Sequence, residues 1–352
     1  MSQASERRVL VPGGAGYVGS VLTPTLLAGG YGVRVLDSLL YDNTDTLAGV
    51  LEQDGFDFVR GDVRSSEEVR SAMEGVTDVV LLAALVGDPV CKKNPDLATQ
   101  TNLEGARNVI AAAADAGVER LIFASTCSNY GLREDDTPAT EEDELHPLSL
   151  YAETKVEMER ELLGAEGLPF SPTVLRVATA YGTSPRMRFD LTVSEFTRAL
   201  TLGQELEVYD ADTWRPYCHT SDISMAILQV LEAPADKVAN EVFNVGGEES
   251  NHTKRSIVTA ALQALEKRGE KGSVTWAEGG ADARNYRVSF DKIAERLGFQ
   301  PKHTVPGAID RLVDAISSGM FADVEERSLA YRNYELTSEP AGGEGTGGGD
   351  AG

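Results

Sequence analysis

The 352-residue chain has only three cysteines, Cys91, Cys127 and Cys218, and they lie far apart in the sequence. This number and spacing favour neither a disulfide framework nor a Cys-x-x-Cys metal site, so we expect reduced thiols. The chain also has only four histidines, and their spacing does not match that of zinc ligands. We therefore expect no bound metal.

The sequence contains no apolar run of about 20 residues, and its first residues lack the basic and apolar segments of a secretory signal. We therefore expect no membrane partner and a cytoplasmic location. Positive charge is scarce as well, because 32 lysines and arginines stand against 56 aspartates and glutamates, a formal net charge of −24. This charge disfavours nucleic acid as a partner. An anionic ligand would need local positive groups, such as a helix N-terminus or a few arginines.

The first apolar segment, residues 8–11, is followed by Gly13, Gly16 and Gly19 in a G-x-x-G-x-x-G pattern. Glycines at this place allow a tight turn, close approach of backbone N–H groups to a pyrophosphate, and close packing of the next helix on the strand. The second apolar segment ends at Asp37. A carboxylate there accepts hydrogen bonds from ribose hydroxyls and repels a 2′-phosphate, which predicts NAD rather than NADP as the cofactor.

Further apolar segments alternate with stretches of helical character, and they are continuous, as is typical of a parallel sheet covered on both faces. Ligands of such sheets bind at the carboxyl ends of the strands. Asp62 and Val63 follow the third segment, and Leu82, Ala83 and Ala84 follow the fourth, where small residues leave space for adenine and ribose. We predict strands over residues 8–11, 33–36, 56–59, 78–82, 120–124, 172–177 and 241–247.

These features predict an α/β fold, namely a doubly wound parallel Rossmann sheet with a smaller, discontinuous C-terminal lobe that binds the substrate. We expect the NAD-binding domain over residues 6–180, with the chain returning to it at about 216–248. The substrate-binding lobe would comprise residues 181–215 and 249–333. From Ser338 on, the chain is rich in glycine and lacks core-forming side chains, so we expect a disordered tail over residues 334–352.

Tyr151 and Lys155 lie four residues apart in a segment of helical character, 149–163. At this spacing the side chains share one helix face, roughly 5 to 6 Å apart at Cβ. A tyrosine with its usual pKa of about 10 is protonated at neutral pH. A cation at ~5 Å, with an effective dielectric near 20, would lower that pKa by roughly two units. The pattern predicts a catalytic base, although by itself it also fits a solvated helix surface.

Together these motifs resemble the extended short-chain dehydrogenase/reductase family, in particular its NAD-dependent nucleotide-sugar epimerases and dehydratases. The resemblance covers roughly residues 8–318. It rests on the order in which the motifs occur: the glycine loop, Asp37, Asp62-Val63, Thr126, Tyr151-x-x-x-Lys155 and Arg215-Pro.

The resemblance implies that Tyr151 is the base, that Lys155 binds the nicotinamide ribose and lowers the tyrosine pKa, and that Thr126 assists catalysis. It also implies that Asn102 supports the active-site loop. The cofactor-binding residues would be Gly13, Gly16, Tyr17, Val18, Asp37, Asp62, Val63, Leu82, Ala83, Ala84, Asn102, Tyr151 and Lys155.

A nucleotide-linked sugar is the implied substrate, with Arg215 and Arg284 on its diphosphate and Thr126 and Thr179 near the sugar. We add Arg186 and Arg188 as phosphate or sugar contacts, although surface charge would explain them equally well. The helices expected over 97–116 and 149–163 resemble the family's dimer-forming pair, so we expect a homodimer.

The implied chemistry begins when Tyr151 takes a hydroxyl proton from the sugar while hydride passes to NAD, which gives a keto-sugar. Dehydratases of this family usually carry an Asp-Glu pair after the catalytic threonine, where this chain has Cys127 and Ser128. Because that pair is missing, we favour an epimerase. Sugar 4-epimerases often have asparagine where this chain has Thr179, so we expect the sugar or its orientation to differ from theirs. The alternatives are a dehydratase or ketoreductase of the same fold, or a regulatory protein that binds NAD without turnover.

Overall fold

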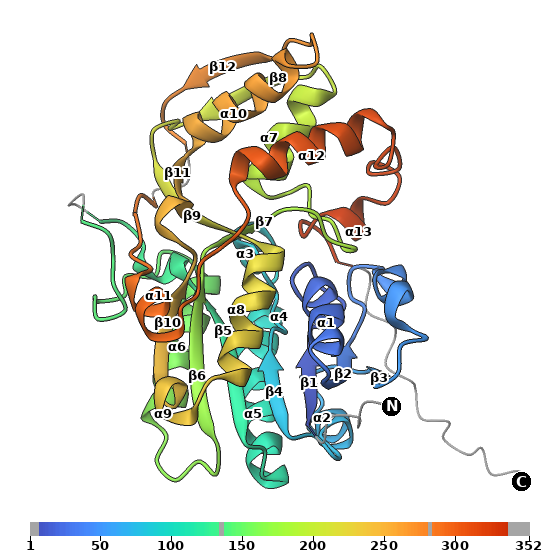
Figure 1. The fold of residues 1–352 in the computed structure, drawn as a ribbon, viewed down its shortest axis with the longest axis vertical. Coiled ribbons are helices and arrows are strands. Elements are labelled where there is room, and N and C mark those ends of the chain that lie inside the picture. Colours follow the sequence, from blue (N-terminus) through green and yellow to red (C-terminus); the bar gives the residue numbers. More distant parts are fainter. Residues whose placement is uncertain (1–6, 134–136, 281–283, 337–352) are drawn as a thin grey trace, which may run out of the picture.

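The computed structural model describes residues 7–133, 137–280 and 284–336. Its main sheet has seven parallel strands in the order β10-β6-β5-β4-β1-β2-β3, so the predicted fold class is confirmed (Figure 1). The strand order reverses between β1 and β4, which is where ligands of such sheets bind. The strands are β1 Arg8–Pro12, β2 Gly32–Asp37, β3 Phe56–Arg60, β4 Asp78–Leu81, β5 Arg120–Thr126, β6 Ser171–Val177 and β10 Glu241–Val245.

Two separate hydrophobic clusters cover the two faces of this sheet. Successive side chains of a strand point to opposite faces, so Val9 and Val11 of β1 join one cluster and Leu10 joins the other. The first cluster includes residues of α1 (Gly19–Ala28), α8 (Thr220–Glu232) and α11 (Asp291–Leu297). The second includes residues of α2 (Ser66–Ala72), α5 (Gly105–Ala116) and α6 (Leu150–Gly164).

The helix expected over residues 97–116 is continuous but changes its winding along its length. It begins as α4 (Pro95–Thr99), passes through a π-helical turn, η2 (Gln100–Glu104), and continues as α5. Such π-helical turns are rare and are frequently found at functional sites. In this chain the turn carries Asn102.

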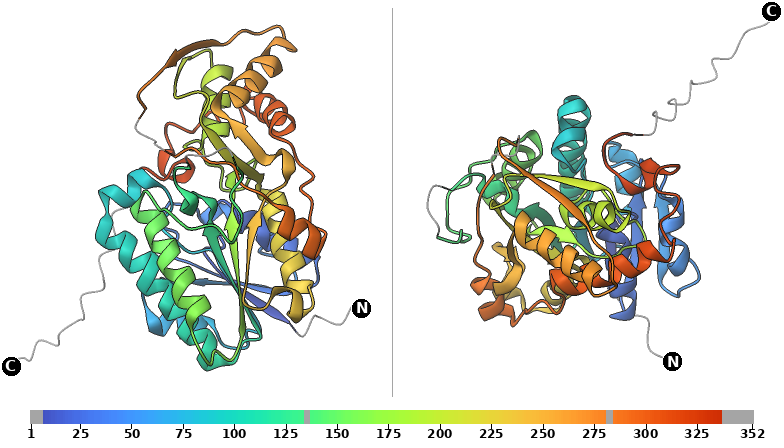
Figure 2. Two further views of the ribbon diagram at one scale, coloured as in Figure 1. Left: turned by 90° about the vertical axis from the view of Figure 1, so that its left-hand side faces the viewer. Right: turned by 90° about the horizontal axis from the view of Figure 1, so that it is seen from above.

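The smaller lobe lies beyond the carboxyl edge of the main sheet (Figures 1 and 2). Its sheets have the order β11-β9-β7 and β12-β8, and its hydrophobic cluster joins residues of α7, α10 and α12. The strands are β7 Thr179–Tyr181, β8 Glu205–Tyr209, β9 Trp214–His219, β11 Asn251–Thr253 and β12 Ser273–Ala277. The helices are α7 Thr192–Thr201, α10 Lys254–Glu266 and α12 Val305–Ser317.

The remaining elements are short connections, and the domain limits proposed above stay a prediction. Of the expected disordered tail, residues 334–336 are described, and Leu336 packs against the cluster formed around Leu85 and Val90. The rest of that tail, residues 337–352, lies outside the described residues. The connections are α3 Asp88–Lys93, α9 Ala235–Val238, α13 Ser328–Tyr331, η1 Thr44–Val50, η3 Cys127–Tyr130 and η4 Glu248–Ser250.

Among the helices in the described parts of the chain, none has both the length and the apolar character needed to cross a bilayer.

Candidate active site

A pocket of about 960 Å³ lies at the carboxyl edge of the main sheet, where the smaller lobe meets it. Its lining contains every predicted cofactor- and substrate-binding residue except Asn102. The structure thus brings together Gly13, Gly16, Tyr17, Val18, Asp37, Asp62, Val63, Leu82, Ala83, Ala84, Thr126, Tyr151, Lys155, Thr179, Arg186, Arg215 and Arg284.

The glycine loop closes tightly against the strand ends. Gly13 has φ +84°, and a Cβ atom built on it would lie 2.7 Å from the backbone nitrogen of Ala83. A Cβ atom on Gly19 would lie 2.5 Å from the carbonyl oxygen of Gly13, so neither position accepts a larger residue. No side chain caps the N-terminus of α1, which leaves that end of the helix suited to a phosphate group. This cradle fits the pyrophosphate of a dinucleotide.

Asp37 ends β2 and lines the same pocket. Its carboxylate accepts hydrogen bonds from the backbone N–H groups of Ala15 at 3.0 Å and Leu39 at 2.9 Å, which fix its orientation. Burial raises the pKa of Asp37, and the two N–H groups oppose this rise. Each carboxylate oxygen can accept a second hydrogen bond, so Asp37 can also bind ribose hydroxyls.

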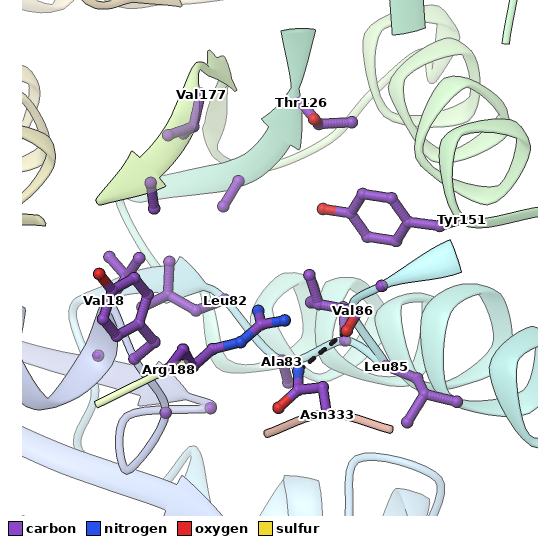
Figure 3. Close-up of a pocket in the computed structure, with 18 of the residues that line it drawn as sticks. Val18, Leu82, Ala83, Leu85, Val86, Thr126, Tyr151, Val177, Arg188 and Asn333 are labelled. Carbon is purple, nitrogen blue, oxygen red and sulfur yellow. Dashed lines mark hydrogen bonds between the residues drawn. The ribbon is translucent and has the colours of Figure 1, made fainter. Parts of the chain in front are cut away.

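Tyr151 and Lys155 lie in the first turns of α6, which Ser149 caps by accepting a hydrogen bond from the N–H of Ala152. Figure 3 shows the Tyr151 phenol pointing into the pocket between Thr126 and Arg188. Lys155 is 3% exposed, and its Nζ lies 5.9 Å from the centre of the Tyr151 ring. The predicted pair therefore shares one side of the pocket.

The pKa of Tyr151 differs from the expectation. Burial of the phenol raises this pKa above its usual value, whereas Arg188 and a hydrogen-bonding interaction with Thr126 lower it. Burial also lowers the pKa of Lys155 to about 8, and Nζ donates a hydrogen bond to the Ala124 carbonyl at 2.7 Å. The predicted lowering of the Tyr151 pKa by Lys155 is therefore wrong. Burial of the phenol dominates this pKa, and the Lys155 ammonium is directed to the Ala124 carbonyl. Without a ligand, Tyr151 is a neutral phenol.

The residues after Thr126 differ in their access to the pocket. Thr126 Oγ1 accepts a hydrogen bond from the Ser128 N–H at 3.1 Å, and both residues line the pocket. Cys127 is 1% exposed and its thiol donates to the Arg176 carbonyl at 3.1 Å. Burial raises the pKa of this thiol, so Cys127 has neither the access nor the acidity to transfer a proton to a ligand.

Asn102 acts behind the pocket wall rather than in it. Its Oδ1 accepts from the Leu85 N–H at 2.7 Å, and its Nδ2 donates to the Leu85 carbonyl at 3.2 Å and to Thr154 Oγ1 at 3.3 Å. Leu85 belongs to the loop after β4 that lines the pocket. These contacts agree with the supporting role implied for Asn102. They do not agree with its prediction as a cofactor-binding residue, because Asn102 does not line the pocket.

The two arginines assigned to the diphosphate both line the pocket. Arg215 is 7% exposed, stacks on Tyr286 at 5.4 Å, and donates to the Trp214 carbonyl at 2.7 Å. Arg284 forms an ion pair with Asp88 at 3.1 Å and lies 3.4 Å from Ser128 Oγ.

Arg186 and Arg188 are buried, so surface charge does not explain them. Arg186 is 3% exposed and stacks on Tyr41 at 4.5 Å, and burial lowers its pKa to about 10. Arg188 holds both carboxylate oxygens of Asp190, at 2.9 Å from Nε and 2.5 Å from Nη2. Both guanidinium groups line the pocket.

Sequence reasoning missed Asp88, Asn333 and Tyr334 as pocket residues. Asp88 follows β4 closely, so its position after a strand was a usable signal. Asn333 and Tyr334 carry no such signal, because they reach the pocket from the end of the described chain. Among the described ranges, no group of three or more His, Cys, Asp or Glu side chains is placed to hold a metal ion.

Residues 9–246 match the model of the NAD dependent epimerase/dehydratase family. A dTDP-glucose 4,6-dehydratase of Streptomyces griseus is 31% identical over 304 residues, which cover 83% of this chain and 89% of that protein.

Two solved structures share the fold over nearly their whole length. The UDP-glucose 4-epimerase of Thermotoga maritima, solved with UDP-glucose, matches with a TM-score of 0.78 and 25% identity over 89% of this chain and 99% of its own. The dTDP-glucose 4,6-dehydratase of Streptomyces venezuelae, solved with NAD, matches with a TM-score of 0.79 and 28% identity, and the match covers 89% of this chain and 98% of that protein. One relative is an epimerase and the other a dehydratase, so these similarities leave the reaction open.

Proposed function

The chain belongs to the NAD-dependent epimerase/dehydratase family, and from this premise we propose that it is an epimerase acting on a nucleotide-linked sugar through a transient keto-sugar. The residues of the glycine loop and Asp37 fit NAD, the cofactor of the family. The pocket of about 960 Å³ is at the upper end of the range of ligand sites, which supports a large ligand.

The observation that carries the epimerase proposal is the state of Cys127. Elimination of water needs an acid and a base beside the sugar. The positions where dehydratases of the family carry that pair hold a buried thiol, which donates to the Arg176 carbonyl, and Ser128. The carboxylate of Asp88, which also lines the pocket, is paired with Arg284 at 3.1 Å. These groups support oxidation and re-reduction of the sugar over elimination.

In the proposed mechanism, bound NAD supplies a hydride acceptor and a positively charged ring. Tyr151 removes the proton from the sugar hydroxyl and holds it at its phenolic oxygen, while Thr126, beside the phenol, orients the reacting oxygen. Arg188 favours the phenolate, since its charge lowers the pKa of Tyr151. Tyr151 returns the proton after the sugar has turned and been reduced on its other face.

A dehydratase is the second candidate, because the Streptomyces griseus relative at 31% identity is a dTDP-glucose 4,6-dehydratase. A ketoreductase or a non-catalytic NAD-binding protein has less support. The Tyr151 phenol faces the pocket with Lys155 on the same helix face, and this arrangement supports an enzyme over a non-catalytic protein.

The deciding experiment incubates the purified chain with UDP-, GDP-, CDP- and dTDP-hexoses and follows the products by proton NMR, mass spectrometry and NADH absorbance. An epimerase gives a diastereomer of unchanged mass with no net NADH. Loss of one water from the sugar would instead identify a dehydratase. Stoichiometric conversion of added NAD to NADH, with formation of a keto-sugar, would identify a ketoreductase running in its oxidative direction. Binding of NAD with no product from any sugar would contradict the enzymatic proposal.

We also propose a homodimer joined through the outer faces of α5 and α6. These helices are linked within one chain by Arg107, which pairs with Glu157 at 2.7 Å and also with Glu161. The cytoplasmic location stays a prediction from the sequence.

A further inference from the structure

The end of the described chain returns to the pocket. At the last residue of α13, the Tyr331 carbonyl accepts a hydrogen bond from the backbone N–H of Phe189 at 2.8 Å. Two residues later, the backbone N–H of Asn333 donates to Asp190 Oδ2 at 3.1 Å. Figure 1 places α13 at the junction between the smaller lobe and the main sheet. The next residues therefore reach the pocket from a fixed point on the lobe.

Asn333 then connects the smaller lobe to the Rossmann sheet. Its Nδ2 donates to the carbonyl of Val86, in the loop after β4, at 2.9 Å. This contact fixes the orientation of the amide, because only the nitrogen can donate to a carbonyl. Asn333 lines the pocket and is 5% exposed (Figure 3).

The other side-chain atom, Asn333 Oδ1, is buried and has no hydrogen-bond partner within the described residues. Buried amide oxygens are nearly always paired, and an unpaired one destabilises the folded protein. A group that lines the ligand pocket and stays unpaired without the ligand is therefore expected to find its partner on the ligand.

The surroundings define the kind of partner. Asp190, which accepts the Asn333 backbone N–H, is anionic, and its charge is paired with Arg188. An amide oxygen only accepts hydrogen bonds, so its partner must be a donor. A hydroxyl group is a neutral donor, and both ligands of this family carry several.

The segment around Asn333 is held on both sides. Tyr334 lines the same pocket, and Leu336 packs against the cluster of Leu85, Val90, Cys91 and Ala98. The Asn333 side chain is thus held at the wall of the cavity that the Tyr151 phenol faces, by contacts to the loop after β4 and to the lobe.

We propose that Asn333 is a ligand-binding residue whose Oδ1 accepts a hydrogen bond from a hydroxyl group of the bound ligand. The hydroxyl belongs to the ribose of NAD or to the sugar of the substrate, and only the second source rests on the proposed function. The segment 329–336 is then part of the ligand site.

The test compares Asn333→Leu, Asn333→Asp and the parent chain. Leucine removes both amide groups, whereas aspartate keeps the acceptor and loses the donor to Val86. We expect Asn333→Leu to bind the ligand more weakly than Asn333→Asp. The added charge of aspartate weakens binding of anionic ligands, so it reduces this difference and does not create it. Arg332→Gln is the matched control, because Arg332 is on the same segment but pairs with Glu325 and does not line the pocket.

Calorimetric titration with NAD comes first, followed by titration of the NAD-loaded chain with UDP-, GDP-, CDP- and dTDP-hexoses. Loss of one neutral hydrogen bond is expected to raise the Kd about 3- to 10-fold in Asn333→Leu. Asn333→Asp should stay within about 3-fold of the parent on the same grounds. A raised Kd for NAD in Asn333→Leu identifies the ribose as the source of the hydroxyl group. A raised Kd for the nucleotide sugar alone identifies the sugar as the source.

Equal loss of affinity in both variants would mean that Asn333 only ties the segment to Val86, which overturns the proposal. The proposal is also overturned if Asn333→Leu binds NAD with the Kd of the parent and binds the nucleotide sugars as the parent does. The same holds if the Kd for NAD is unchanged and the parent binds none of the nucleotide sugars. Melting of the ligand-free variants shows whether each is folded. If the leucine variant is not folded, Asn333→Ala removes the same oxygen without a larger apolar group. If the parent chain binds NAD but turns over no sugar, this result counts against the proposed function only. The NAD titration of the Asn333 variants still tests the proposal for Asn333.

Discussion

The ammonium group of Lys155 donates a hydrogen bond to the Ala124 carbonyl at 2.7 Å while lying 5.9 Å from the centre of the Tyr151 ring. It also lies 4.6 Å from the centre of the Phe123 ring. The cation is therefore buried against β5, and burial dominates the pKa of both members of the pair. In the ligand-free protein, Tyr151 is thus held as a phenol.

Replacement of Lys155 by methionine should remove a buried charge and stabilise the fold. The folded-state pKa of about 8, against 10.5 for an unperturbed lysine, means that the unfolded chain binds more protons between these values. The parent chain therefore gains stability as pH rises through this range. At pH 7 we expect Lys155→Met to unfold with a free energy higher by up to about 3 kcal/mol, and the difference to shrink towards pH 10.

Denaturant unfolding at both pH values measures this difference, and turnover of the variant should be lost. Lys271→Met, at an exposed lysine, is the control and should show no pH-dependent difference. A Lys155→Met variant that is less stable than the parent by the same amount at both pH values would contradict the argument.

Tyr151→Phe removes only the phenolic oxygen. We expect turnover to fall about 10²- to 10⁴-fold, as is usual on loss of a general acid–base group, with the Kd for NAD nearly unchanged. Steady-state rates and NAD titration on the same preparation separate the two effects. Tyr209→Phe, at an exposed phenol on β8, serves as the control. Turnover at the parent rate in Tyr151→Phe would remove Tyr151 from the mechanism.

The parts of the site that were predictable from the sequence are those set by local geometry. The glycine loop and Asp37 depend on a strand, a turn and a helix that follow one another, and the Tyr151 and Lys155 spacing fixes one helix face. The pKa of Tyr151 was not predictable, because it depends on burial by residues from several elements. Asn333 was not predictable either, since its partners Val86 and Asp190 are far from it in the sequence.

Asn102 gives a test of how the π-helical turn supports the pocket. Its amide pairs with both backbone groups of Leu85, and the residue is 3% exposed. Asn102→Leu leaves the Leu85 N–H without this partner, so we expect a loss of about 1 to 3 kcal/mol of unfolding free energy and weaker NAD binding. Denaturant unfolding and NAD titration measure the two effects. Gln100→Leu, exposed in the same turn, is the control, and equal effects in both variants would count against the specific role.

We propose that Asp37 sets the choice between NAD and NADP. Its carboxylate is held by the N–H groups of Ala15 and Leu39, so it cannot move away from a 2′-phosphate. We expect NAD to bind at least about tenfold more tightly than NADP, and Asp37→Ser to reduce this preference by removing the repelling charge. Calorimetric titration with both cofactors gives the ratio. The assignment is wrong if the parent chain prefers NADP.

The proposed dimer predicts that a charge on the outer face of α5 separates the subunits. Ala111 is exposed on this helix, among small residues that would let a second helix pack closely. Ala111→Arg places a long cation there, and a dimer formed through α5 and α6 would have to bury it without a partner, at a cost of several kcal/mol. Light scattering at micromolar concentration should show a dimer for the parent and a monomer for the variant. Ala322→Arg, on an exposed residue after α12, should remain dimeric. A monomeric parent chain would contradict the dimer, and a dimeric Ala111→Arg variant would place the interface elsewhere.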